Sequence, residues 1–132
     1  GETEDEFEET VALCEEIEFA AVHVFPYSIR PGTSAAHFRN QVDSHVKHER
    51  VQRLLRISEL QAAAFRERFI GTVMPVLWEK SVGTHDSTMK EWFGLTDNYI
   101  RVVSHSDRSL ENQVTQAQLL LYKKGIVLVQ VL

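Results

Sequence analysis

The sequence predicts an α/β segment followed by a small all-β barrel of five antiparallel strands. An amphipathic helical pattern over residues 4–18 is followed by a short β-rich apolar run at residues 21–26. A helix followed by a buried strand is one unit of an α/β architecture. After Gly71 the pattern changes to five short β-rich segments separated by turn residues, which is typical of a small barrel.

The first helix has a clear start signal. Thr3 followed three residues later by Glu6 forms a capping box, and carboxylates in the first turn suit the positive end of the helix dipole. Apolar residues at helical spacing predict one buried face. They are Phe7, Val11, Cys14 and Ile17. Residues 1–18 hold nine acidic groups and no Lys or Arg, and we interpret them as a solvated outer face rather than a metal site.

Residues 21–26 are too short for a helix and rich in apolar and β-branched side chains, so they predict a strand buried on both faces. Such a strand requires neighbours on both sides. The 132 residues offer no second parallel strand, so we expect the chain to begin partway through a larger domain. Pro31 and Gly32 open a loop that reaches Ala36.

A long amphipathic helix is predicted from about Asp43 to Arg68, and Gly71 is placed to stop it. Its apolar stripe consists of Val51, Leu54, Leu55, Ala62, Phe65 and Phe69. Basic residues recur every third position at Lys47, Arg50, Arg53 and Arg56. At 3.6 residues per turn this spacing moves around the helix, so no single basic edge is expected.

The predicted strands of the barrel are Val73–Lys80, Thr88–Leu95, Asn98–Ser104, Asn112–Tyr122 and Ile126–Leu132. The intervening turns include Gly83–Asp86 and Lys123–Gly125. Pro75 cannot donate to a ladder and should lie at an edge or a bulge.

Composition limits the function. The chain is 43% hydrophobic and 25% charged, has no apolar run near the roughly 20 residues of a membrane span, and contains one cysteine. That cysteine excludes an internal disulfide framework and favours a reducing, cytoplasmic setting. The net charge of −5 argues against a free-standing nucleic-acid binder. However, residues 19–71 carry eight basic and four acidic groups, so this middle segment is able to face RNA.

Several motifs carry a family resemblance. They are GET at residues 1–3, HVFPYSIRPGTSAA at residues 23–36, Gln41-Val42, Lys47 with Arg50, and TDNYI at residues 96–100. With them the chain resembles the C-terminal third of the radical S-adenosylmethionine tRNA methylthiotransferases. The motifs HVFPYS and TDNY favour the subgroup that modifies threonylcarbamoyladenosine. The resemblance implies addition of a methylthio group to C2 of N6-threonylcarbamoyladenosine at position 37 of tRNA.

The resemblance also implies a domain plan. Residues 1–40 would be the last part of a radical-SAM β/α barrel, residues 41–70 a connecting helix, and residues 72–132 an RNA-binding TRAM β-barrel. The full-length enzyme would use [4Fe-4S] clusters and S-adenosylmethionine, with tRNA as partner. Cys14 is expected to be a core residue, and neither cysteine cluster motif occurs here, so the fragment alone is expected to be inactive.

The sequence departs from the family pattern in the barrel. The usual Gly-Lys-Thr entry is Gly71-Thr72-Val73, and residues 72–132 carry six basic and six acidic groups. RNA binding by this segment alone is therefore expected to be weak and salt-sensitive.

Candidate site residues follow from position. Tyr27 and Arg30 come just after the predicted strand and are expected to line the cofactor cleft; alternatively they tie the loop to the long helix, for instance through Glu49. The RNA-binding candidates are Asn98, Tyr99, Arg101, Lys123 and Lys124. A tyrosine stacks on bases and cations meet phosphates, although a solvated turn explains the lysine pair equally well.

No metal site is predicted, because His45 and His48 form half a zinc site with only His37 nearby. Two other functions remain open. The chain is either a stand-alone TRAM-type RNA-binding module without catalysis, or an unrelated α+β interaction domain.

Overall fold

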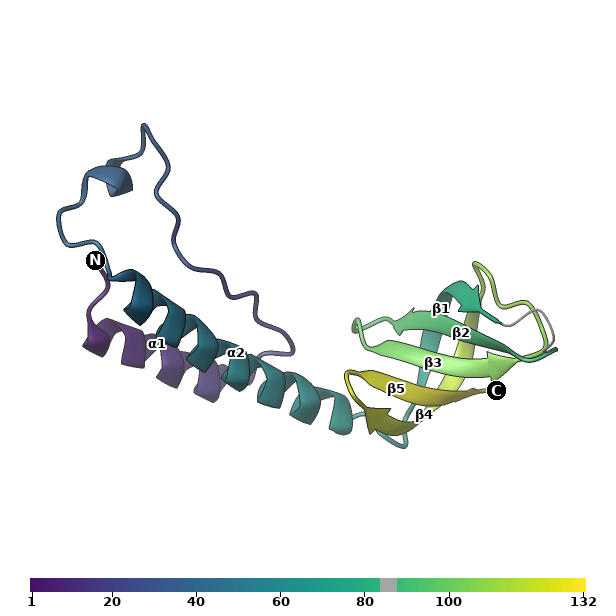
Figure 1. Cartoon of the computed structure of the whole chain (residues 1–132). Helices are drawn as coiled ribbons and strands as arrows, with labels where there is room; N and C mark the ends of the chain where they lie inside the picture. The colour runs from purple at the N-terminus through teal and green to yellow at the C-terminus, as the bar shows by residue number, and fades with distance from the viewer. Residues whose placement is uncertain (84–87) are drawn as a thin grey trace. The chain divides into compact units, whose positions relative to one another are not determined.

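The computed structural model describes residues 1–83 and 88–132. Of the predicted turn Gly83–Asp86, only Gly83 lies within these residues. The chain divides into two compact units, Gly1–Phe65 and Arg66–Leu132 (Figure 1). We call them the helical unit and the barrel unit.

Helix α1 spans Glu4–Ile17 and confirms the predicted start. The Glu6 backbone N–H donates to Thr3 Oγ1 at 3.3 Å, and the Thr3 N–H donates to Glu6 Oε2 at 2.7 Å. Phe7, Val11 and Cys14 are buried as expected. The prediction was wrong for Ile17, which is half exposed. At 3.6 residues per turn Ile17 is rotated by about 80° from Phe7, away from the buried face.

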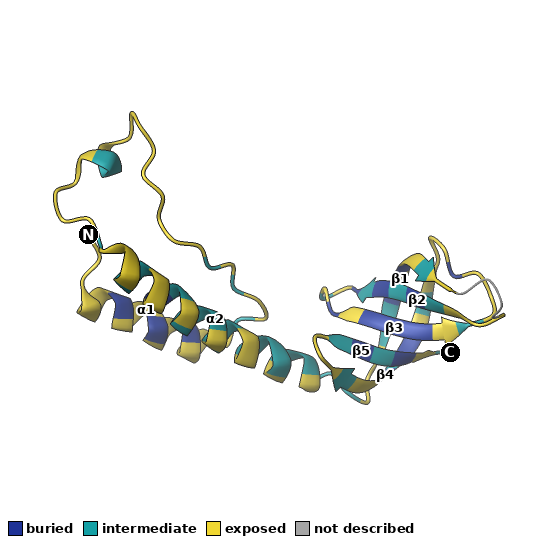
Figure 2. Ribbon diagram, viewed as in Figure 1, coloured by how far each residue is buried: buried dark blue, intermediate teal, exposed yellow. Residues whose placement is uncertain are grey.

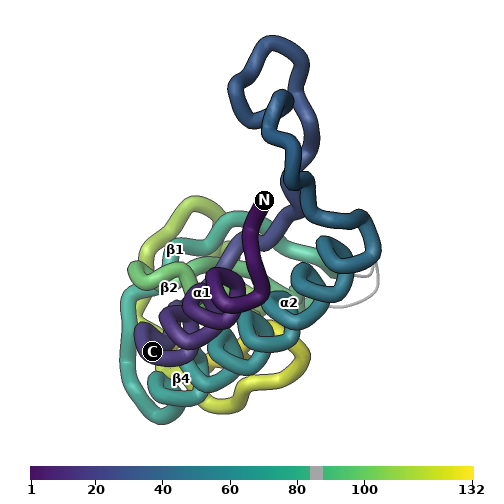
Figure 3. The backbone as a smooth tube through the Cα atoms, turned by 90° about the vertical axis from the view of Figure 1, so that its left-hand side faces the viewer, coloured from purple at the N-terminus to yellow at the C-terminus, as the bar shows by residue number. Residues whose placement is uncertain are grey.

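Helix α2 spans Ser44–Glu67, within one residue of the prediction at each end. Three contacts between the helices span nearly constant separations of 46, 45 and 47 residues, from Arg50, Arg53 and Gln61 to α1. A constant separation means that the helices run in the same direction, side by side, as Figures 1 and 3 show. Two parallel helices require a connection that crosses back along them.

The predicted strand at residues 21–26 does not form. These residues belong to the connection between the helices, whose one regular element is the short 3₁₀ helix η1, Ser34–His37. Val22 and Val24 are half-buried, whereas Phe25 is 80% exposed. The physical reason is that an extended segment becomes a strand only by pairing, and no described strand lies beside it. The described residues before Val73 therefore contain no strand of a β/α barrel.

The barrel unit confirms the five predicted strands. They are β1 Val73–Val82, β2 Lys90–Thr96, β3 Arg101–Ser106, β4 Val114–Lys123 and β5 Ile126–Val131. They close into a barrel in the order β1-β2-β3-β5-β4 (Figure 1). Pro75 lies where β1 pairs with β4 alone, because pairing with β2 starts at Val76, so its position at a local edge is confirmed.

The all-antiparallel prediction was wrong at one place. Strands β3 and β5 are parallel, with Val102 opposite Val127 and Val103 opposite Leu128. In a closed ring, strictly alternating strand directions require an even number of strands. Five strands therefore leave at least one parallel pair.

Inward-facing side chains fill the barrel, and the buried residues of its strands are dark blue on the ribbon in Figure 2. Those with almost no exposed surface are Val76, Trp78, Ile100, Val102, Leu119 and Val127. Trp78 Nε1 donates to Thr115 Oγ1 at 2.8 Å, which satisfies the indole inside the core. At Gly94 an added Cβ would lie 2.6 Å from the Leu77 carbonyl oxygen, so β1 and β2 approach too closely there for any side chain.

Candidate nucleic-acid interface

The turn between β2 and β3 is held by a ring of hydrogen bonds. Thr96 Oγ1 accepts from the Ile100 N–H at 2.9 Å and donates to Asn98 Oδ1 at 2.6 Å. The backbone N–H of Thr96 donates to the Ile100 carbonyl, and that of Tyr99 to the Thr96 carbonyl, each at 3.1 Å. Asn98 is thus half-buried and serves the turn, while Arg101 opens β3.

Tyr99 is a highly exposed aromatic residue in this turn. Its φ is 64°, in the left-handed region that bulky residues rarely adopt, and its side chain is 83% exposed. The neighbouring Ile100 is buried in the barrel. The turn therefore presents an aromatic ring to solvent from a backbone that its own hydrogen bonds hold.

The turn between β4 and β5 is a two-residue hairpin loop. Lys124 and Gly125 both have positive φ, at 49° and 86°, which is the type I′ geometry of tight hairpins. Lys123 and Lys124 are exposed. The predicted lysine pair therefore lies at a hairpin tip.

The parallel pairing of β3 with β5 brings these turns together. Val102 lies opposite Val127, and Tyr99 and Lys124 each come three residues before this pair, in the turns that lead into β3 and β5. Paired strands lie about 4.8 Å apart, so the two turns are neighbours at one end of the barrel, as Figure 1 shows. We call residues 97–101 and 123–125 the two-turn end. It contains all five predicted RNA-binding residues.

The charge of the two-turn end is positive. It holds Arg101, Lys123 and Lys124 against one carboxylate, Asp97. In the described part of the chain none of these three cations forms an ion pair. The barrel is neutral on average, yet this end offers cations that no internal partner neutralises.

One contact beside this end was not predicted. The Arg66 guanidinium lies over the ring of Tyr122, 5.8 Å from the ring centroid. Tyr122 immediately precedes Lys123 in the chain. Sequence patterns carry no signal for it, because the two residues belong to different elements.

The helical unit holds an open groove of about 740 Å³. Its lining includes Phe7, Val24, Phe25, Tyr27, Phe38 and Arg50. Tyr27 thus lines the groove, whereas Arg30 is absent from its lining. The Arg30 carbonyl accepts from Thr33 Oγ1 at 2.9 Å. Glu49 Oε1 lies 3.3 Å from His45 Nε2, and no ion pair between Arg30 and Glu49 occurs among the described residues.

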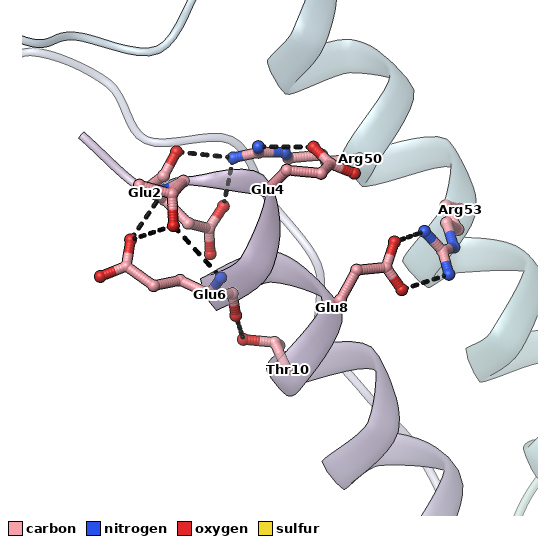
Figure 4. Close-up of polar contacts among 8 residues, drawn as sticks. Glu2, Glu4, Glu6, Glu8, Thr10, Arg50 and Arg53 are labelled. Atoms are coloured by element: carbon pink, nitrogen blue, oxygen red, sulfur yellow. Dashed lines mark hydrogen bonds and ion pairs between the residues drawn. The ribbon is translucent and has the colours of Figure 1, made fainter.

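A charged seam joins α1 and α2 (Figure 4). The Arg50 guanidinium, 10% exposed, contacts Glu2 Oε2 and Glu4 Oε2 at 2.8 Å each and lies 5.0 Å from the Phe7 centroid. Arg53 pairs with both carboxylate oxygens of Glu8. The interpretation of the acidic run as a solvated face was thus incomplete. The opposite charges of residues 1–18 and 19–71 were the available signal.

These contacts shift the acid–base properties of the seam. The hydrogen bond from Arg53 lowers the pKa of Glu8 below its ordinary value of 4.5. Hydrogen bonds from Thr3 lower the pKa of Glu6, and the hydrogen bond to Glu4 raises the pKa of Arg50. Arg50 and Arg53 therefore serve the helix pair and do not offer free charges to RNA.

Neither a metal site nor a membrane helix is found in the residues that the structure describes. No group of three or more His, Cys, Asp or Glu there is placed to hold a metal ion. Neither helix among the described residues has the long apolar stretch that a membrane span requires. Cys14 is buried among apolar residues of α1, as expected for a core position.

Comparisons with known proteins give the family resemblance independent support, although no family model matches the chain. Over 121 residues, 91% of the chain, it is 37% identical to the threonylcarbamoyladenosine tRNA methylthiotransferase MtaB of Bacillus subtilis, covering 26% of that protein. The chain is a homologue of tRNA methylthiotransferases. The resemblance to the C-terminal part of such an enzyme is confirmed at this level.

Two further relatives are tRNA-2-methylthio-N(6)-dimethylallyladenosine synthases. The protein of Thermobifida fusca is 40% identical over 94 residues, 71% of the chain and 19% of the relative. That of Bartonella bacilliformis is 45% identical over 85 residues, 64% of the chain and 18% of the relative. The chain thus spans about a quarter or less of the length of these relatives.

Proposed function

We propose that this chain is the C-terminal part of a radical S-adenosylmethionine tRNA methylthiotransferase. The helical unit contributes to the catalytic domain and the barrel unit, as a TRAM domain, holds tRNA. The observation that carries this proposal is the similarity to a tRNA-modifying enzyme over 91% of the chain, across both units. The two-turn end supplies the cations that an RNA backbone requires.

The proposed substrate is N6-threonylcarbamoyladenosine at position 37 of tRNA, which receives a methylthio group at C2. The support is the relative named for threonylcarbamoyladenosine, which aligns with most of the chain. The relatives named for dimethylallyladenosine align with 64–71% of it. The alternative substrate is therefore dimethylallyladenosine, and mass spectrometry of tRNA nucleosides from cells lacking the gene distinguishes the two.

The cofactors of the proposed reaction need ligands from elsewhere in the enzyme. An iron–sulfur cluster is held by several cysteine thiolates, and Cys14 is single and buried. The residues of this chain therefore do not fit a cluster, and we derive no step through it. Tyr27 and Arg30 are proposed to line the S-adenosylmethionine cleft only in the complete domain, so the fragment alone is inactive. A cytoplasmic location agrees with this activity.

The path of the helical unit supports a role as part of a larger α/β domain. Its two helices run parallel, and residues 21–26 cross back between them in an extended form, tied to α2 by a 3.3 Å hydrogen bond from Ser58 Oγ to the Val22 carbonyl. This is the course of a helix–strand–helix unit without neighbouring strands. We propose that residues 21–26 become a strand when the rest of the domain is present.

A second candidate is a stand-alone RNA-binding module without catalysis. The observation that favours it is closure of the barrel within residues 73–131, which needs no outside strand. Catalysis separates the two candidates. A longer protein that contains this chain should bind a reducible [4Fe-4S] cluster and cleave S-adenosylmethionine, and a cluster-free longer protein would refute the enzyme proposal.

Titration of the chain with fluorescent tRNA tests the binding role common to both candidates. With three cations on phosphates, affinity should fall about 20- to 40-fold between roughly 50 and 200 mM salt, as counterion release requires. Absence of salt-dependent binding would contradict a tRNA-holding barrel.

A further inference from the structure

We infer that the two-turn end is a subsite for one unpaired RNA nucleotide. Tyr99 stacks on its base, and Lys124 together with Arg101 binds the adjoining phosphate. This inference rests on the proposed RNA-binding function and assigns it to a defined place on the barrel.

The backbone conformation of Tyr99 is unusual for an aromatic residue. A left-handed backbone disfavours an aromatic residue, so something must hold this one in place. The hydrogen bonds that join Thr96 to Asn98, Tyr99 and Ile100 do so. The ring is 83% exposed and packs little against the barrel that carries it. Because the backbone that carries the ring is already held, less entropy is lost there when a base stacks on the ring.

Lys124 and Arg101 are the cations available for the adjoining phosphate. The register of β3 and β5 brings the turn that carries Lys124 to the same end of the barrel as the turn that carries Tyr99, and Arg101 follows two residues after the ring. Like Tyr99, Lys124 is held in the left-handed region, by the type I′ hairpin. Within the described residues neither cation has an acidic partner. A cation next to an aromatic platform is the pattern by which proteins bind single-stranded nucleic acid.

An exposed ring on a turn suits an unpaired nucleotide better than a paired one. Bases inside a duplex are stacked on both faces by their neighbours, so a ring on a turn cannot reach them without unstacking. An unpaired base has a free face. Stacking also tolerates any base, so the subsite should select unpaired structure rather than sequence.

The first test replaces the ring. The full chain is titrated, by fluorescence anisotropy, with a single-stranded RNA of about eight nucleotides and with an RNA hairpin stem of equal phosphate number. Tyr99→Asn removes the ring but keeps a residue that tolerates the left-handed region. Affinity for the single strand should fall roughly 5- to 150-fold with an unchanged salt slope, and affinity for the stem should change little. Tyr99→Phe keeps the ring at the same position, so it is the matched control and should retain binding.

The second test replaces the cation. Lys124→Asn creates an Asn-Gly pair, which type I′ turns favour, so the hairpin remains while one charge is lost. The slope of log affinity against log salt should become shallower by about 0.7, the value for one phosphate of a single strand. Lys90→Gln, at the opposite end of β2, is the matched control and should leave the slope unchanged.

The outcomes separate this inference from the proposed function. If the wild-type chain binds RNA with salt dependence but Tyr99→Asn and Lys124→Asn bind equally well, the subsite is wrong and the proposed function stands. If Tyr99→Asn weakens stem and single strand alike, selection of unpaired nucleotides is wrong. If the wild-type chain binds neither RNA, both proposals fail. Circular dichroism of each variant shows that it is folded.

Discussion

The barrel unit and the helical unit obtain their stability in different ways. In the barrel every strand pairs with a neighbour on each side, because the sheet closes on itself. In the helical unit α1 buries only Phe7, Val11 and Cys14, and the charged seam lies beside them. Phe25 and Phe38 stay 80% and 60% exposed on the connection between the helices. The strands of the barrel therefore pair with one another within this chain, whereas residues 21–26 have no described strand to pair with.

The largest effect is expected from a substitution that forces β1 and β2 apart inside the barrel. In Gly94→Ala the new Cβ meets the Leu77 carbonyl oxygen at 2.6 Å, a backbone atom that cannot move aside without disturbing β1. We expect a loss of about 3 kcal/mol in the free energy of unfolding, measured by urea denaturation followed through tryptophan fluorescence.

Gly83→Ala is the matched control, since its nearest neighbour would be the flexible Lys90 side chain at 3.3 Å. A Gly94→Ala barrel as stable as wild type would show that β1 and β2 are not held at this separation.

The corresponding test of the helical unit removes the centre of the charged seam. Arg50→Met keeps the apolar stem over Phe7 but leaves Glu2 and Glu4 without their cation. The guanidinium is nearly buried while its partners are partly exposed, so we expect a loss of about 2 kcal/mol, between the values for exposed and buried pairs. Hydrogen exchange of the α1 amides measures it.

Arg56→Met is the control, because Arg56 is an exposed arginine on the same helix. Equal effects of the two substitutions would mean that the ion pairs of Arg50 do not hold the helices together.

Acid should weaken the helical unit by a smaller amount. The pKa values of Glu6 and Glu8 are lowered in the folded chain. Each group thus adds stability above its ordinary pKa of 4.5, and this contribution is lost as the pH falls through the lower folded value. Urea denaturation followed by helical circular dichroism should show lower stability at pH 3 than at pH 7. Glu8→Gln should reduce that difference, and an unchanged pH dependence would argue against the Arg53–Glu8 pair.

Much of the fold was predictable because local patterns determine it. The capping box of Thr3 and Glu6 placed the start of α1, and the limits of α2 followed from its apolar periodicity and Gly71. The five strands of the barrel followed from turn residues and β-rich composition. These signals depend on neighbours in the chain, so a sequence contains them directly.

The candidate site was predictable only as separate pieces. Tyr99 and the lysines at 123 and 124 were recognisable as exposed turn residues. That they share one end of the barrel depends on the parallel pairing of β3 with β5, which joins segments with no local relation. Had closure been known, the odd number of strands would have required a parallel pair.

The sequence alone was enough to place the two helices and the five barrel strands to within a few residues, and to identify the turns that carry aromatic and basic residues. The tertiary structure was needed to show which parts of the chain pair. Arg50 forms ion pairs with Glu2 and Glu4, and β3 pairs with β5. Residues 21–26 pair with no described strand. The physical reason is that propensity and capping act over a few residues. Hydrogen-bonded pairing and charge pairing instead depend on what the whole chain brings within reach.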